Sequence, residues 1–79
     1  MDRIKLIWDF RGPNAAPIAK HHVIHLKEFA QLEGLENTIC ETETLSPNHH
    51  LAFMVVGKEH MESLRERLKP NRGQIYNEK

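Results

Sequence analysis

The chain has 79 residues, a formal net charge of zero and a single cysteine. This length predicts one domain spanning residues 1–79, with a small core and marginal stability. The lone Cys40 excludes an internal disulfide and fits a reducing cytoplasm, which is the location we expect. Balanced charge argues against a dedicated nucleic-acid or membrane partner, and no run of residues approaches the roughly 18 apolar residues of a membrane span.

The first elements are a strand and a long helix. Residues 4–10 alternate in polarity and predict a strand that places Leu6 and Trp8 on one face and Asp9 on the other. After a Gly-Pro-Asn turn, residues 14–33 predict a helix that stops at Gly34. Its apolar stripe consists of Ala15, Ala19, Val23, Leu26, Phe29 and Ala30.

The second half of the chain predicts two more strands, a helix and a short final strand. Residues 38–45 are rich in Thr and Glu and predict an edge strand, whereas residues 50–56 are apolar and predict a central one. Residues 58–68 predict a short helix, and residues 74–76 a last strand. The order β-α-β-β-α-β indicates an α+β, ferredoxin-like fold with an antiparallel sheet of order 4-1-3-2 and both helices on one face.

Six histidines are the main candidates for function. If Leu51, Phe53 and Val55 face the helices, His50 faces the open side of the sheet beside Asp9. A carboxylate that accepts a hydrogen bond from imidazole fixes its tautomer, as a general base requires. His49 would then point into the helix layer, toward His22.

These positions define a candidate site near the end of the first strand. The candidate catalytic residues are Asp9, His25 and His50, and the candidate ligand-binding residues are Trp8, Arg11, His22 and His49. The competing interpretation is structural: His22 falls inside the apolar stripe and would be buried and hydrogen-bonded. His25 lies on the flank of the stripe, and His21 points away from it.

His21 and His25 have the i, i+4 spacing of metal ligands on a helix. Residue 22 is His rather than the Glu of a metalloprotease motif, and no third ligand is fixed by the sequence. Two solvated histidines on a helix flank are the alternative, and we expect no metal and no cofactor. Cys40 has no catalytic signature around it.

The open face of the predicted sheet carries Ile7, Cys40 and Met54 by the same alternation. Such an apolar face needs a cover, and a second copy of the sheet would provide it. We therefore expect a homodimer. An RNA-binding sheet would need aromatic side chains on this face, but Trp8 and Phe53 are expected on the helix side.

The segment His22-x-x-His25-Leu26-x-x-Phe29, followed by Gly34, resembles the first helix of the YCII-related family, and the likeness spans residues 20–60. Members of that family are ferredoxin-like and pair sheet to sheet as dimeric α/β barrels. The resemblance implies the dimer and carries a catalytic His over to His25. The family's Asp-Pro after the second helix is Lys69-Pro70 here, so the acidic partner at that site is missing.

Three functions remain open at this point. The first is a small ligand bound in a His-lined cleft, with or without acid–base chemistry by His and Asp. The second is a His-based metal-binding module. The third is a non-catalytic dimeric interaction domain.

Overall fold

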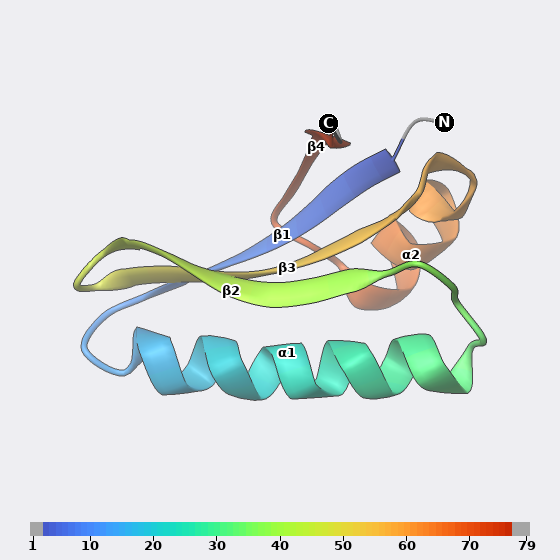
Figure 1. The fold of residues 1–79 in the computed structure, drawn as a ribbon. Helices are drawn as coiled ribbons and strands as arrows, with labels where there is room; N and C mark the ends of the chain where they lie inside the picture. The colour runs from blue at the N-terminus through green and yellow to red at the C-terminus, as the bar shows by residue number, and fades with distance from the viewer. Residues whose placement is uncertain (1–2, 77–79) are drawn as a thin grey trace.

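The computed structural model describes residues 3–76 (Figure 1). The observed elements follow the predicted order, and each boundary lies within two residues of the predicted one except the start of α2, which a 3-10 turn moves from residue 58 to residue 61. They are β1 (Arg3–Arg11), α1 (Ala15–Leu32), β2 (Ile39–Ser46), β3 (His49–Gly57), a 3-10 turn (Lys58–His60), α2 (Met61–Leu68) and β4 (Arg72–Tyr76).

The strands form one antiparallel sheet in the order β2-β3-β1-β4, which is the predicted order read from the other edge. Helix α1 runs along one face of this sheet, and α2 lies on the same side near one end (Figure 1). The opposite face has no helix over it within residues 3–76. The fold is therefore α+β with an open sheet face. No helix of the described residues is long and apolar enough to cross a membrane.

The apolar stripe predicted for α1 is confirmed. Its buried residues are Ala15, Ala19, Val23, Leu26 and Ala30. Phe29 is partly buried against the same core, to which Leu64 of α2 also belongs. Gly34 ends the helix with a φ of 68°, a left-handed conformation that suits glycine.

The predicted faces of β2 and β3 are wrong. Leu6 pairs directly with Met54, and Trp8 pairs with Ala52. Direct partners share a face of the sheet, so Ala52 and Met54 lie under the helices, where both are fully buried. Cys40, paired with Met54, is buried there too. Leu51, Phe53 and Val55 accordingly lie on the open face, opposite to the prediction.

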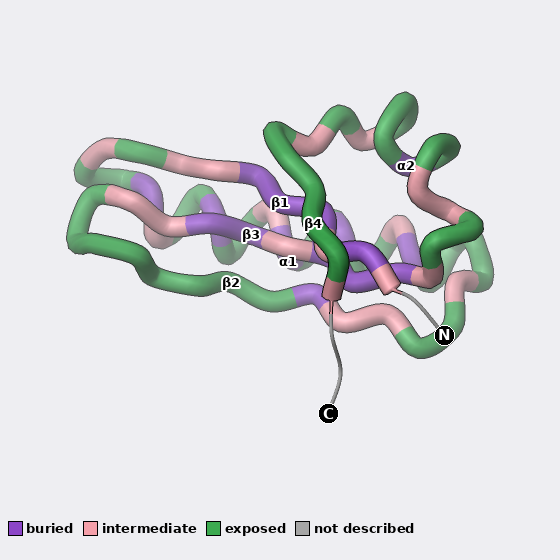
Figure 2. The backbone as a smooth tube through the Cα atoms, turned by 90° about the horizontal axis from the view of Figure 1, so that it is seen from above, coloured by how far each residue is buried: buried purple, intermediate pink, exposed green. Residues whose placement is uncertain are grey.

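The open face is not an exposed apolar surface. Ile7, Leu51 and Val55 lie on it and are no more than 3% exposed. Each has a charged direct partner on the neighbouring strand: the pairs are Ile7 with Arg72, Leu51 with Asp9, and Val55 with Lys5. Figure 2 shows the buried stretches in β1 and β3, whereas β2 and β4 at the two edges of the sheet are mostly exposed. The motive for a dimer that buries Cys40 and Met54 is removed, because both side chains lie in the core.

Besides the packing of Leu64 in the core, a side-chain hydrogen bond from Trp8 connects the end of α2 to the sheet. The Trp8 indole Nε1 donates a hydrogen bond to the Leu68 carbonyl at 3.0 Å. That carbonyl belongs to the last turn of α2, where helix carbonyls lack partners within the helix. Lys69 follows with a φ of 49°, and its amide bonds to the Arg65 carbonyl.

Candidate functional site

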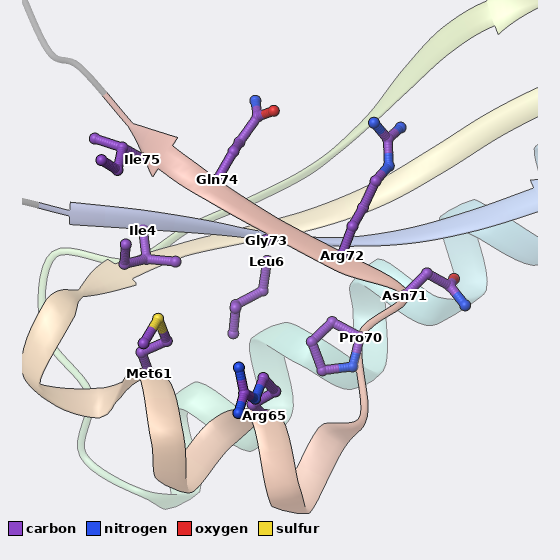
Figure 3. Close-up of a pocket in the computed structure, with 10 residues that line it drawn as sticks. All are labelled: Ile4, Leu6, Met61, Arg65, Pro70, Asn71, Arg72, Gly73, Gln74 and Ile75. Carbon is purple, nitrogen blue, oxygen red and sulfur yellow. The ribbon is translucent and has the colours of Figure 1, made fainter.

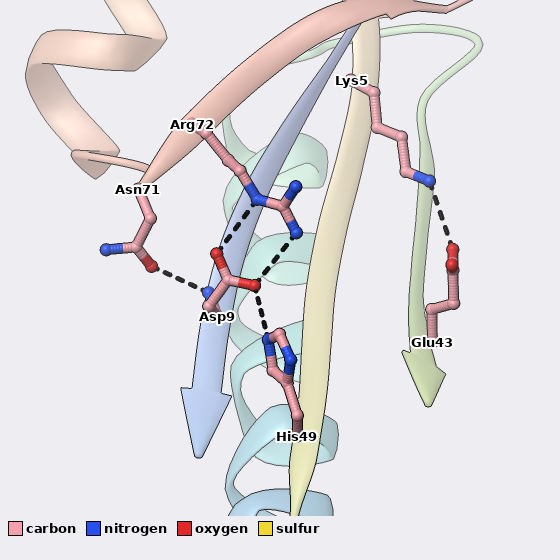
Figure 4. A network of polar contacts seen from close by, with 6 residues as sticks. All are labelled: Lys5, Asp9, Glu43, His49, Asn71 and Arg72. Atoms are coloured by element: carbon pink, nitrogen blue, oxygen red, sulfur yellow. Dashed lines mark hydrogen bonds and ion pairs between the residues drawn. The ribbon is translucent and has the colours of Figure 1, made fainter. Parts of the chain in front are cut away.

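A carboxylate near the end of β1 gathers side chains from three strands on the open face. The Asp9 Oδ1 accepts a hydrogen bond from His49 Nε2 at 2.8 Å, and Arg72 Nη2 donates to the same oxygen at 3.1 Å. Arg72 Nε donates to Asp9 Oδ2, also at 3.1 Å. We call Asp9, His49, Asn71 and Arg72 the Asp9 cluster (Figure 4).

Asn71 fixes the start of β4 against β1. Its side-chain Oδ1 accepts the Asp9 backbone N–H at 2.7 Å, and its own N–H donates to the Ile7 carbonyl at 2.9 Å. The next residue is Arg72, so these two bonds set the position from which the guanidinium reaches the carboxylate. The geometry of the cluster thus depends on the backbone as well as on charge.

The cluster keeps its carboxylate ionised. The hydrogen bond from Arg72 lowers the pKa of Asp9 most, burial opposes this, and the hydrogen bond with His49 lowers the pKa further. The same contact raises the pKa of Arg72. An ionised carboxylate can only accept hydrogen bonds, so we assign the hydrogen on the facing His49 nitrogen, Nε2. When the ring is neutral, its Nδ1 then carries the lone pair, and Nδ1 has no partner within residues 3–76.

The sequence predicted an Asp–His pair on the open face, but the predicted histidine, His50, is not the one that contacts Asp9. His49, not His50, contacts Asp9, because β3 presents the opposite face to that expected. His50 Nδ1 lies 3.0 Å from Thr44 Oγ1, and its Nε2 lies 3.3 Å from the Pro47 carbonyl. His50 therefore stabilises the turn between β2 and β3.

His22 lies on the other side of the sheet, among aromatic rings. Its ring centroid is 4.9 Å from that of Trp8 and 5.5 Å from that of Phe10. Burial is the main cause that lowers the pKa of His22, and the charge of nearby His25 adds to it. The predicted hydrogen bond is not found, because the buried Nε2 has no partner among residues 3–76.

His25 and Arg11 do not join either group. His25 is exposed on α1, where its Nε2 lies 2.9 Å from His21 Nε2 and its Nδ1 lies 3.6 Å from Glu28 Oε1. Arg11 is exposed at the end of β1. Within the described part of the chain, no three His, Cys, Asp or Glu side chains are placed to hold a metal ion. The sheet therefore divides the predicted site, with Trp8 and His22 on one side and the Asp9 cluster on the other.

Asn71 and Arg72 were not predicted as site residues. Residues 69–73 looked like a loop, with the last strand starting at residue 74. A signal was nevertheless present: in sheet order 4-1-3-2 the fourth strand lies beside the first, so polar residues just after Pro70 fall near Asp9. No protein-family model, curated protein or solved structure matches this chain. Function is therefore inferred from the chemistry of the described residues.

Proposed function

We propose that this protein binds a small polar ligand at the Asp9 cluster, with His49 exchanging a proton with it. The observation that carries the proposal is the 2.8 Å contact between His49 Nε2 and Asp9 Oδ1, in a carboxylate also held by Arg72. A carboxylate on one imidazole nitrogen orients the ring and assigns the other nitrogen to the ligand. His49 Nδ1 is the nitrogen assigned in this way.

Arg72 supplies the second recognition element. A guanidinium has five N–H donors, and Asp9 engages the Nε and Nη2 groups. The remaining donors are free to bind an oxygen of a ligand lying over β1. A ligand that offers an oxygen to Arg72 and an ionisable proton to His49 fits this pair, as a small hydroxy or keto acid would.

The proposal includes a ferredoxin-like homodimer whose open sheet faces meet. Two observations support it: no helix of the described chain covers the Asp9 cluster, and Phe53 is only partly buried on the same face. A second sheet over this face would enclose the cluster and exclude water, which strengthens its electrostatic interactions. The dimeric α/β barrels of the YCII-related family, which the first helix resembles, are built in this way.

Sedimentation velocity tests the dimer. Wild type at tens of micromolar should sediment as a dimer, and Phe53→Ser should shift the distribution toward monomer while the circular dichroism spectrum stays unchanged. A wild-type monomer at this concentration contradicts the dimer. Met54→Lys is unsuitable as a test, because it would place a charge in the core.

Ligand binding is tested by NMR on the ¹⁵N-labelled protein with a panel of small hydroxy, keto and amino acids. We expect at least one compound to shift the His49 ring nitrogens and Arg72 Nε saturably. His49→Gln should abolish that response, whereas His60→Gln, which removes a histidine outside the cluster, should retain it. A panel without any response at His49 and Arg72 contradicts the proposal and leaves the cluster as a connection between three strands.

A further inference from the structure

A cavity lies on the helix side of the sheet, between α2 and β4 (Figure 3). Its volume of about 410 Å³ falls within the roughly 300–1,000 Å³ typical of small-molecule pockets. Apolar side chains form one part of its wall: Ile4, Leu6, Met61, Pro70 and Ile75. The other lining residues are Gly73 and the polar Arg65, Asn71, Arg72 and Gln74. Asn71 and Arg72 of the Asp9 cluster also line this cavity, but the Asp9 carboxylate that they contact lies on the opposite face of the sheet.

A glycine in β4 leaves the space open. Gly73 pairs directly with Leu6, whose side chain faces the helices. A Cβ at Gly73 would lie 3.6 Å from Leu6 Cδ2 and 3.8 Å from the Lys5 carbonyl, which are ordinary contacts. The backbone there would accept a side chain, and a larger one would extend into the cavity. Ile75, two residues on and 67% exposed, forms an apolar wall that is open to solvent.

Two arginines, Arg65 and Arg72, are among the lining residues, and Arg65 is exposed to solvent. Arg65 of α2 lines the cavity, and its side chain makes no hydrogen bond or ion pair with any of residues 3–76. The neighbouring arginines differ: Arg67 binds Glu33 at 2.8 Å, and Arg72 binds Asp9. In Figure 3, Arg65 and Met61 lie on the α2 side of the cavity, while Gln74 and Arg72 project from the other side of β4.

We propose that this cavity binds a small amphipathic carboxylate. The carboxylate pairs with the Arg65 guanidinium, which is suited to a two-bonded contact, and the apolar body packs against Leu6 and Met61. Charge complementarity selects an anion, because Arg65 has no counter-ion of its own. The apolar wall selects an alkyl or aryl chain over a fully polar acid.

The test uses three probes that separate the contribution of the carboxylate charge from that of the alkyl chain: sodium octanoate, 1-octanol and sodium acetate. Each is titrated into ¹⁵N-labelled wild type, and the amide signals of Met61, Gly73 and Ile75 and the Arg65 Nε signal are followed. Octanoate should bind saturably and about tenfold more tightly than 1-octanol, the effect of one charge-assisted hydrogen bond. Acetate should give no saturable shift. Equal affinity for octanoate and 1-octanol, or octanoate shifts that avoid the cavity, would overturn the proposal.

Two variants then assign the contacts. Arg65→Gln should weaken octanoate about tenfold and leave 1-octanol unchanged, because only the charge is lost. Lys58→Gln, the matched loss of a cation outside the cavity, should change neither affinity. Gly73→Val should abolish binding of both octanoate and 1-octanol, because the valine side chain fills the cavity. The melting temperature of this variant without ligand shows whether it folds.

Gly73→Ala provides a milder change if the valine variant does not fold. It should weaken the binding of octanoate and of 1-octanol without abolishing it. A folded Gly73→Val protein that binds octanoate as wild type does would refute the site. His49→Gln should leave octanoate binding intact, so the two proposed sites can fail independently.

Discussion

The ring of His22 packs against Trp8, with 4.9 Å between the ring centroids, while its buried Nε2 lacks a hydrogen-bond partner among residues 3–76. A buried donor or acceptor without a partner costs about 1–3 kcal/mol. Burial also disfavours the charged imidazolium, and this lowers the pKa of His22 below its ordinary value of 6.5. The folded protein therefore favours a neutral His22 ring, and protonation of this ring lowers the stability of the fold.

His22→Leu should show this effect directly. As pH falls below about 6.5, the unfolded chain binds the His22 proton before the folded protein does, so the free energy of unfolding of wild type decreases. Leucine cannot be protonated and leaves no polar atom unpaired. As pH is lowered from 8 to 5.5, the free energy of unfolding of His22→Leu, measured in urea, should increase relative to that of wild type. The difference at pH 8 is the control for the change in packing. A difference that does not change with pH would contradict a neutral, buried His22.

Asp9→Asn should destabilise the sheet by about 1–3 kcal/mol, because it removes the charge that holds Arg72 and His49. Since the pKa of Asp9 is lowered in the folded state, its stabilisation is complete above the ordinary value of 3.8 and is lost as pH falls through the lower, folded-state value. Asp9→Asn should lack this acid-dependent loss. The control is Glu43→Gln, which removes an ion pair with Lys5 on the same face and should cost less than about 1 kcal/mol. Equal costs would contradict a special role for the cluster.

The fold could be predicted from the sequence because its elements carry strong local signals. The helical stripe through Ala19, Val23 and Leu26 and the stop at Gly34 needed no tertiary information. The face of β3 could not be predicted, because residues 51–56 are apolar at both odd and even positions and the two-residue alternation is absent. The register of β3 against β1, with Leu6 opposite Met54, decides the face.

The error in the site has the same origin. Because β3 presents the face opposite to the predicted one, the partner of Asp9 is His49 instead of His50. The same reversal places Cys40 and Met54 in the core. The Asp–His pair itself followed from topology, which brings the end of β1 beside the start of β3. Arg72 could not be identified as a partner of Asp9 from its polarity alone. The hydrogen bonds between Asn71 and β1 determine its position beside the carboxylate.

Met54→Ala and Phe53→Ala compare neighbouring residues on opposite faces of β3. Met54 is fully buried under the helices, and its truncation should cost about 2–5 kcal/mol. Phe53 is partly buried on the open face, where Lys5 Nζ lies 4.2 Å from its ring centroid, so its truncation should cost less than half as much. Chemical denaturation of both variants under dimer-free, dilute conditions measures the difference. The reverse order would support the face assignment that the sequence suggested.

Zinc or nickel should leave the melting temperature of the protein unchanged. His21 and His25 supply two imidazole nitrogens on an exposed helix face, and the described residues provide no third ligand for the ion. His21→Ala should accordingly be neutral to within about 0.5 kcal/mol, as for other surface changes. A steep metal-dependent rise in melting temperature that His21→Ala abolishes would establish the metal module instead.

Two residues with left-handed backbone form a matched pair at the ends of the helices. Lys69, after α2, has a φ of 49°, and Gly34, after α1, has a φ of 68°. This conformation costs a residue with a Cβ about 1 kcal/mol relative to glycine, and nothing lies within 4 Å of a Cβ placed at Gly34. Gly34→Ala should therefore destabilise through the backbone alone, by about 1 kcal/mol.

Lys69→Gly should act in the opposite direction. Relief of the left-handed backbone is partly offset by the greater freedom of glycine in the unfolded chain, so we expect a gain of about 0.5–1 kcal/mol. For a domain of this size that gain raises the melting temperature by about 2–8 °C, which calorimetry resolves. The amide bond from residue 69 to the Arg65 carbonyl should persist, since glycine keeps the N–H. A lower melting temperature for Lys69→Gly would show that the lysine side chain stabilises the end of α2 by more than its backbone costs.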